Sequence, residues 1–280
     1  MTHRFKIQKG VGGILKHGVL LLLLAYVSLP IIFLLLGSIK TEREIIGNPF
    51  GLPSQIILEH YRNAWLEGRL GSAMADTILV GVAVTIVISL VAGMAAFSMT
   101  FLRIPGQGLL YTLFLLTMQV PVHMYIVPLF IEWRNLHLLN TPLGIIIIYS
   151  AVYLPFSILF LHSQFAALPK ELLEASQLDG CSHLRALAQI IFPVSRPAFV
   201  TISLINLKWV WNEFPLAITF LQDPSFQTMT PRYLELSAKY VSTYAITSAG
   251  AVISAFPILI AYFLMQRHFV QGMTAGTIKA

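Results

Sequence analysis

The stretch PKELLEASQLDGCSHLRALAQIIFPVSRP, residues 169–197, is a polar interval between two long hydrophobic segments. Its first half predicts a short helix, because Pro169 suits the first helical turn and Glu174 lies early enough to favour the positive N-terminal end. Gly180 can adopt the left-handed conformation that closes a helix, and Ser182 can cap the next one. The stretch is therefore predicted to fold as helix, sharp glycine turn, helix.

The second predicted helix carries apolar residues at helical spacing, namely Leu184, Leu187, Ile190 and Ile191. We expect Pro193 to end it. On the first helix the small side chains of Ala175 and Ser176 would let another protein approach the backbone closely. Two interpretations remain open at this point: a docking element for a partner protein, or an amphipathic connector that lies on the membrane surface.

The composition predicts a polytopic membrane protein. Of 280 residues, 56% are hydrophobic and only 11% are charged, and the mean hydropathy is +0.77. A helix needs roughly 20 residues to cross the hydrocarbon core. Six segments meet this requirement, and the expected fold is an all-α bundle of six transmembrane helices in a single domain, 1–280. The segments are 19–37, 73–97, 109–131, 143–165, 198–221 and 245–265.

The distribution of lysine and arginine favours a cytoplasmic N-terminus. Ten basic residues lie in the segments on that side and seven on the other: Arg4, Lys6, Lys9, Lys16, Arg103, Lys170, Arg185, Arg196, Arg267 and Lys279 against Lys40, Arg43, Arg62, Arg69, Arg134, Arg232 and Lys239. With six spans, both termini and the 169–193 loop would be cytoplasmic. The basic charge is then explained by membrane orientation and anionic lipid, without nucleic acid. A single cysteine, Cys181, excludes an internal disulfide.

A few polar residues fall inside the predicted spans. Lys208, Asn212 and Glu213 all lie in the fifth span, and burying such groups in lipid is costly, so they are candidates for function. Lys208 and Glu213 are five residues apart and do not form an obvious pair within one helix. Glu213 either lines a translocation path or makes a structural bond at an interface. Asp76 is expected to cap the second span.

The spacing Glu174-Ala175-Ser176, three residues, Gly180, nine residues, Ile190, one residue, Phe192-Pro193 resembles the signature loop of permease subunits of binding-protein-dependent ABC importers. Further runs resemble the smaller, maltose-type permease of carbohydrate importers: 29–30 (LP), 38–40 (SIK), 58–65 (LEHYRNAW), 95–98 (AAFS), 126–130 (IVPLF), 211–214 (WNEF) and 269–279 (FVQGMTAGTIK). The resemblance covers nearly the whole chain. Ser176, Phe192 and Thr277 depart from the pattern, where the family has alanine, leucine and alanine.

The resemblance implies roles for four groups of residues. The cytoplasmic loop 169–193 would be the coupling loop that docks in the ATPase, through Glu174, Ala175, Ser176, Asp179, Gly180, Ile190 and Pro193. The motif in the fifth span would place Asn212 and Glu213 on the translocation path. The loop 222–244 would face the external binding protein through Asp223, Gln227, Arg232 and Tyr233, or would instead be a membrane-surface helix. The tail 266–280 would contact the ATPase through Gly272, Gly276 and Lys279.

The implied partners are a second homologous permease subunit, two ATP-binding cassette ATPase subunits, an extracytoplasmic solute-binding protein and membrane lipid, in the inner membrane of a prokaryote. ATP and Mg²⁺ would be bound by the ATPase subunits, because this sequence has no G-x-x-x-x-G-K-[ST] motif. A secondary transporter is less consistent with the sequence, which shows no internal repeat of spans. An intramembrane enzyme would need a motif such as H-E-x-x-H or G-x-S-x-G, and neither occurs.

Overall fold

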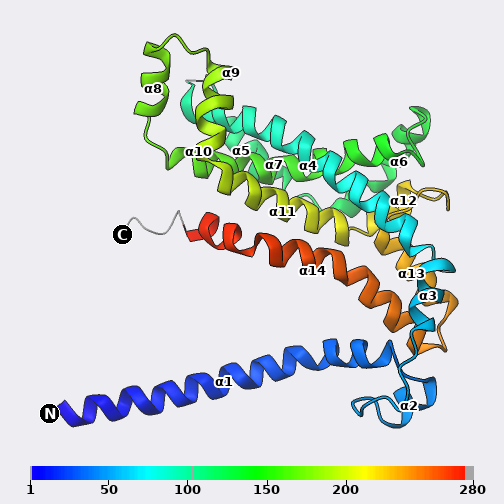
Figure 1. The fold of residues 1–280 in the computed structure, drawn as a ribbon. Helices are drawn as coiled ribbons and strands as arrows, with labels where there is room; N and C mark the ends of the chain where they lie inside the picture. The colour runs from blue at the N-terminus through cyan, green and yellow to red at the C-terminus, as the bar shows by residue number, and fades with distance from the viewer. Residues whose placement is uncertain (1, 103, 275–280) are drawn as a thin grey trace. The chain divides into compact units, whose positions relative to one another are not determined.

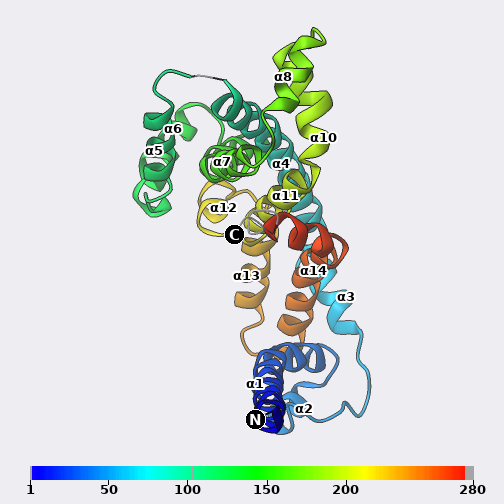
Figure 2. The same ribbon diagram turned by 90° about the vertical axis from the view of Figure 1, so that its left-hand side faces the viewer.

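The computed structural model describes residues 2–102 and 104–274, and every regular element in this part of the chain is helical (Figures 1 and 2). The predicted all-α class is confirmed. Two compact units are formed. The first joins the N-terminal part of the chain, up to Arg69, with Glu235–Ile253. The second joins Leu70–Leu234 with the residues from Ser254 onward.

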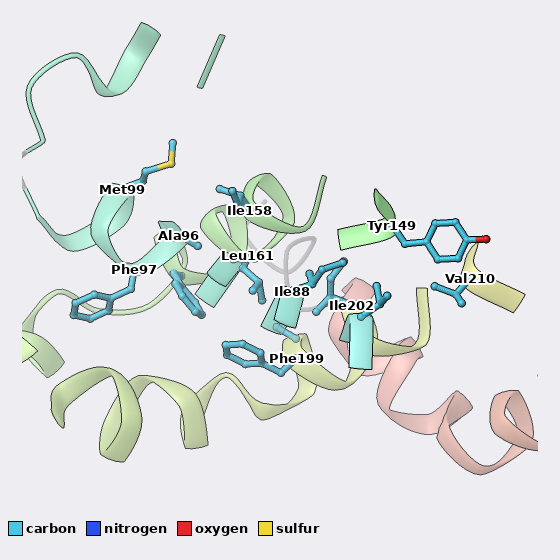
Figure 3. Packing of buried hydrophobic residues seen from close by; sticks show 14 of the residues in the cluster. Ile88, Ala96, Phe97, Met99, Tyr149, Ile158, Leu161, Phe199, Ile202 and Val210 are labelled. Carbon is cyan, nitrogen blue, oxygen red and sulfur yellow. The ribbon is translucent and has the colours of Figure 1, made fainter. Parts of the chain in front are cut away.

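Three long helices build the core of the second unit: α4 (Leu70–Phe101), α7 (Pro142–Ala166) and α11 (Arg196–Asn212). α4 packs against both α7 and α11. Its fully buried side chains recur every four residues, at Val80, Val84, Ile88, Ala92 and Ala96. Side chains four apart share one face of a helix, so this row supplies a continuous apolar contact surface. Figure 3 shows Ile88 of α4 among Leu161 of α7 and Ile202 of α11.

Two glycines of α4 lie where α11 comes close. A Cβ atom on Gly93 would lie 3.2 Å from the ring of Phe199, and one on Gly81 would lie 3.0 Å from a methyl group of Leu207. Small residues at such positions let membrane helices approach closely. α4 and α11 are therefore closely packed at these two positions.

Four helices within residues 2–102 and 104–274 are long and apolar enough to cross a membrane: Lys16–Gly37 of α1 (Thr2–Gly37), α4, α7 and Tyr244–Leu264 of α14 (Tyr244–Thr274). A fifth crossing results if His183–Val194 and Arg196–Asn212, which are bent by 82°, are taken as one span. These spans support a multi-pass membrane protein. The predicted number of six is not confirmed by them.

The predicted third span, 109–131, is not one helix. It is divided into α5 (Gln107–Thr117), the short 3-10 turn η1 (Val122–Met124) and α6 (Ile126–Asn135). Pro121 lies at the break in extended conformation. Proline has no N–H for the helix ladder, and its ring clashes with the carbonyl four residues earlier, which explains why the helix does not continue.

The predicted fifth span, 198–221, is also divided. α11 ends at Asn212, and a separate short helix, α12 (Pro215–Phe220), follows. Glu213 is extended and Phe214 lies outside the helical region. Because a proline disfavours the helical conformation of the residue before it, Pro215 accounts for the break at Phe214.

The remaining helices lie in the connecting segments. The 169–193 loop contains α8 (Glu171–Leu178), α9 (His183–Ala186), the π-helical turn η2 (Leu187–Ile191) and α10 (Phe192–Val194). The 222–244 loop contains α13 (Met229–Lys239). The predicted tail, 266–280, begins as a continuation of α14 as far as Thr274.

The first unit holds α1, α2 (Glu42–Gly47), α3 (Glu59–Leu66) and the first turns of α14. Lys40 is fully buried, and its Nζ donates hydrogen bonds of 3.0 Å to the carbonyls of Asn48 and Pro49. The N–H of Ala245 lies in the first turn of α14, where the helix offers it no partner, and it donates a 2.7 Å hydrogen bond to the carboxylate of Glu42. These polar contacts order the segment between the first two spans.

Replacing Gly93 by valine tests the α4–α11 packing. We expect the variant to destabilise the protein by about 1–3 kcal/mol, because the added methyl groups would be forced against the Phe199 ring. The readout is the thermal unfolding midpoint of the purified protein in detergent. Gly108→Val in α5 is the matched control, since nothing lies within 4 Å of a Cβ at that position. Equal midpoints for the two variants would contradict the proposed close approach.

Candidate functional site

α8 is closed by a tight glycine turn. Gly180 adopts φ +74°, its N–H donates to the carbonyl of Gln177 at 3.0 Å, and the N–H of Cys181 donates to the carbonyl of Ser176 at 2.9 Å. This pair of bonds is the Schellman arrangement that satisfies the last carbonyls of a helix. Ser182 then accepts a hydrogen bond from the N–H of Arg185 and caps α9, as predicted.

The outer face of α8 is exposed and its inner face is buried. Glu174, Ala175, Leu178 and Asp179 are exposed, and Leu178 keeps 90% of its surface accessible. Leu173 and Ser176 are buried. The predicted coupling residues are therefore divided between two faces. Leu178 was not among the predicted coupling residues, although its position four residues after Glu174, next to the glycine turn, places it on the exposed face.

The helix that follows does not end at Pro193, so that prediction was wrong. Helical structure continues through α10 to Val194, and the 82° bend lies at Ser195. Just before the proline, the N–H of Phe192 donates to the carbonyl of Leu187, five residues earlier. A π-helical turn widens the helix, which accommodates a proline ring that would clash in a regular α-helix. Within this turn Ile191 is fully buried, whereas Ile190 is only partly covered.

The break between α11 and α12 is organised by Glu213. Its carboxylate accepts hydrogen bonds of 2.8 Å from the N–H groups of Leu216 and Ala217 and of 2.7 Å from the hydroxyl of Tyr149 on α7. Of the two roles left open for Glu213, the structural bond is present in this structure. Glu213 also borders a cavity of about 350 Å³ that Lys208 and Asn212 line.

Lys208 and Asn212 lie one turn apart on an exposed face of α11. The side-chain amide of Asn212 donates to the carbonyl of Lys208 at 2.8 Å. A second cavity of about 560 Å³ is lined by the same two residues, and Trp209 borders both cavities. Lys208 and Trp209 therefore lie with Asn212 on this face. The sequence signal for this face was the charge of Lys208 within a predicted span.

The 222–244 loop is tied to the bundle by hydrogen bonds. Thr77 of α4 accepts a 2.7 Å bond from the N–H of Met229 at the start of α13, and Asp76 accepts one of 3.4 Å from the N–H of Gln227. Asp76 was expected to cap its own span, but α4 begins earlier, at Leu70. Asp76 instead accepts a hydrogen bond from the backbone just before α13.

The four predicted docking residues of this loop differ in exposure. Gln227 and Arg232 are buried within the chain, and a guanidinium N–H of Arg232 donates to the carbonyl of Pro224 at 2.6 Å. The structure therefore corrects their expected place on the surface. Asp223 is exposed, and hydrogen bonds from Ser225 hold the pKa of its carboxyl below the usual value. Tyr233 is half-buried, and burial raises the pKa of its phenol.

Gly272, a predicted tail residue, lies in the last turns of α14. Gly276 and Lys279 lie outside the described residues. Among residues 2–102 and 104–274, no group of three or more histidine, cysteine, aspartate or glutamate residues is placed to hold a metal ion.

Comparisons with known proteins agree with this architecture. The family described as "Binding-protein-dependent transport system inner membrane component" matches residues 85–275. The diacetylchitobiose uptake system permease protein of Streptomyces coelicolor is 33% identical over 95% of this chain and 88% of its own length. A probable starch degradation products transport system permease protein of Thermoanaerobacterium thermosulfurigenes is 27% identical over 89% of this chain and 91% of its own length.

The fold also matches a chain in the crystal structure of a bacterial ABC transporter involved in the import of the acidic polysaccharide alginate. The TM-score is 0.81, with 24% identity, over 92% of this chain and 96% of that chain. Because the family match spans well over half of the sequence and one relative is 33% identical over nearly all of it, this chain belongs to the inner-membrane permease components of binding-protein-dependent ABC importers.

Proposed function

We propose that this chain forms half of the translocation path of an importer for a sugar or related solute in a prokaryotic inner membrane. As a permease component, it leaves ATP hydrolysis to separate subunits. The relatives named for diacetylchitobiose and for starch degradation products support a saccharide as the solute.

The assembly that we propose contains a second homologous permease, two ATPase subunits that bind ATP and Mg²⁺, and an extracytoplasmic solute-binding protein. Both termini and the 169–193 loop would face the cytoplasm, where the ATPases lie. The C-terminal residues Gly272, Gly276 and Lys279 would contact the ATPases as well. Lipid would cover apolar faces such as that of α1, whose leucines from Leu20 to Leu24 are exposed in this chain.

The observation that carries this proposal is the geometry of the 169–193 loop. α8 has an exposed face with Glu174, Ala175 and Leu178. It ends in a turn in which the last carbonyls of the helix accept hydrogen bonds from the turn itself. Such an element can transmit a movement because it does not depend on the partner for its own structure. The 82° bend at Ser195 then connects it to α11, which carries the cavity-lining residues.

Replacing Gly180 by valine is the first test of coupling. A β-branched residue at φ +74° strains the backbone by roughly 1–2 kcal/mol, so α8 would be displaced. In the importer reconstituted with its ATPases and binding protein, we expect solute uptake per ATP to fall about tenfold while the protein still inserts.

Gly106→Val is the matched control for this test. Gly106 also has a positive φ, +76°, but it precedes α5 outside the loop. The strain would be similar, and coupling should be retained. If both variants transported as wild type does, with the ATPase fully associated, the assignment of the coupling loop would be wrong.

Replacing Leu178 by serine is the second test. Leu178 is 90% exposed, and its burial against a partner would contribute about 1.5–3 kcal/mol. We expect the ATPase to bind the variant at least about tenfold more weakly, as measured by titration of the ATPase against the permease in nanodiscs. Leu52→Ser is the control, because Leu52 is 89% exposed but lies outside the loop. Equal affinity for the two variants would exclude Leu178 from the interface.

Reversing the charge of Asp223 tests the proposed contact with the solute-binding protein. Asp223 is exposed and charged at neutral pH, since its pKa is lowered. We expect Asp223→Lys to reduce the stimulation of ATPase activity by the loaded binding protein at low salt, and the defect to shrink at high salt. Asp223→Asn is the control, because an asparagine can still accept the hydrogen bond from the N–H of Ser225. Stimulation equal to that of wild type across a low-salt titration would contradict the contact.

A further inference from the structure

The two cavities beside α11 adjoin, because both are lined by Phe156, Lys208, Trp209 and Asn212. Their volumes are about 560 and 350 Å³, which is within the range of sites for small molecules. Tyr262 of α14 lines the larger cavity and Tyr153 of α7 the smaller one. The site is therefore built from three helices of the second unit.

The charge of Lys208 restricts what can cover this face. Lys208 is exposed in the middle of a predicted span, and no carboxylate among the described residues lies within ion-pair distance of its Nζ. A lysine near the middle of a span is costly when it faces lipid. Asn212, one turn further along, is exposed on the same face. This face must therefore meet water, a polar ligand or polar groups of another subunit.

Aromatic rings form the apolar part of the same site. The ring of Trp209 lies edge-on to Phe156, with centroids 4.9 Å apart, and lies 5.1 Å from the ring of Tyr153. These contacts hold Trp209 in place without covering it, since the residue remains partly exposed. A fixed aromatic surface beside an amide and an ammonium group combines apolar and polar recognition in one place.

We propose that this face, defined by Lys208, Trp209 and Asn212, is a solute-contact half-site of this chain. Its ligand is a saccharide whose C–H face stacks on Trp209 and whose ring oxygens accept hydrogen bonds from Lys208 and Asn212. The second permease subunit would supply the other half. This inference rests on the proposed function, since it names the residues of this chain that contact the transported sugar.

Thiol labelling tests whether the face is wet and whether sugar covers it. The substitution Cys181→Ser first removes the single cysteine of this chain. Lys208→Cys and Asn212→Cys are then introduced in turn, in the importer reconstituted with all its subunits. We expect a charged, membrane-impermeant thiol reagent to modify both. Leu22→Cys on α1 is the lipid-facing control, because Leu22 is 73% exposed in an apolar span.

The sugar for this test is first found by measuring uptake by the wild-type importer of diacetylchitobiose, maltotriose and an alginate trisaccharide. With the transported sugar delivered by its binding protein, we expect modification of both cysteines to slow about tenfold or more. If the sugar does not slow the labelling, the half-site is overturned while the importer function still stands. Cysteines that do not react even in the absence of sugar would also overturn the half-site, because the face would then be closed to solute. Absence of uptake for every sugar would instead count against the proposed solute class.

A second readout separates contact with sugar from a structural role. We expect Lys208→Gln and Trp209→Leu to lower the sugar imported per ATP hydrolysed about tenfold, while the loaded binding protein still stimulates the ATPase. Lys208→Arg should restore most of the ratio, because it keeps a cationic donor. An unchanged ratio in both Lys208→Gln and Trp209→Leu would overturn the proposal.

Discussion

A helix that stops inside a membrane leaves backbone N–H and C=O groups without partners, and each such group costs several kcal/mol in hydrocarbon. The break between α11 and α12 falls within the predicted fifth span, and side chains bond to the backbone groups that it exposes. The carboxylate of Glu213 accepts hydrogen bonds from the N–H groups of Leu216 and Ala217, and Pro215 has no N–H that needs a partner. On the other side of the break, Thr230 donates a 2.8 Å hydrogen bond to the carbonyl of Trp211.

The arrangement around this break depends on those bonds. Because Tyr149 also donates a hydrogen bond to Glu213, the end of α11 is fixed to the N-terminal half of α7. α12 then packs against α6 and α7, and its Phe220 lies among the rings of Phe130 and Trp133. The carbonyl of Phe220 accepts a 2.8 Å hydrogen bond from the N–H of Asn140. One carboxylate thus allows the chain to turn within the bundle and positions the face of α11 that carries Lys208.

The 169–197 stretch satisfies its backbone in a different way, through local bonds. The glycine turn closes α8, Ser182 caps α9, and the π-helical turn accommodates Pro193. No long-range partner is needed for these contacts. An element of this kind can present Leu178 and Glu174 to another subunit while keeping its own shape, which the proposed transmission of an ATP-driven movement would require.

The sequence by itself determined the features that local chemistry controls. The all-α class followed from hydropathy, the turn at Gly180 from the need for a positive φ, and the cap at Ser182 from its place before an apolar repeat. The family resemblance was likewise carried by spacing along the chain. The breaks at Pro121 and Pro215 could have been predicted from the sequence, since proline prevents a regular helix. They were not, because hydropathy averaged over a long window does not detect a single proline.

Only the tertiary structure decided which side of each element faces the rest of the protein. Arg232 and Gln227 looked like surface contacts because they are polar, yet they are buried, and Arg232 donates to the carbonyl of Pro224. Glu213 and Lys208 looked alike as intramembrane charges, but Glu213 is bonded at the helix break and Lys208 lines a cavity. A sequence gives the cost of placing a polar group in the membrane, whereas the partner that offsets this cost comes from a distant segment, and only folding brings the two together.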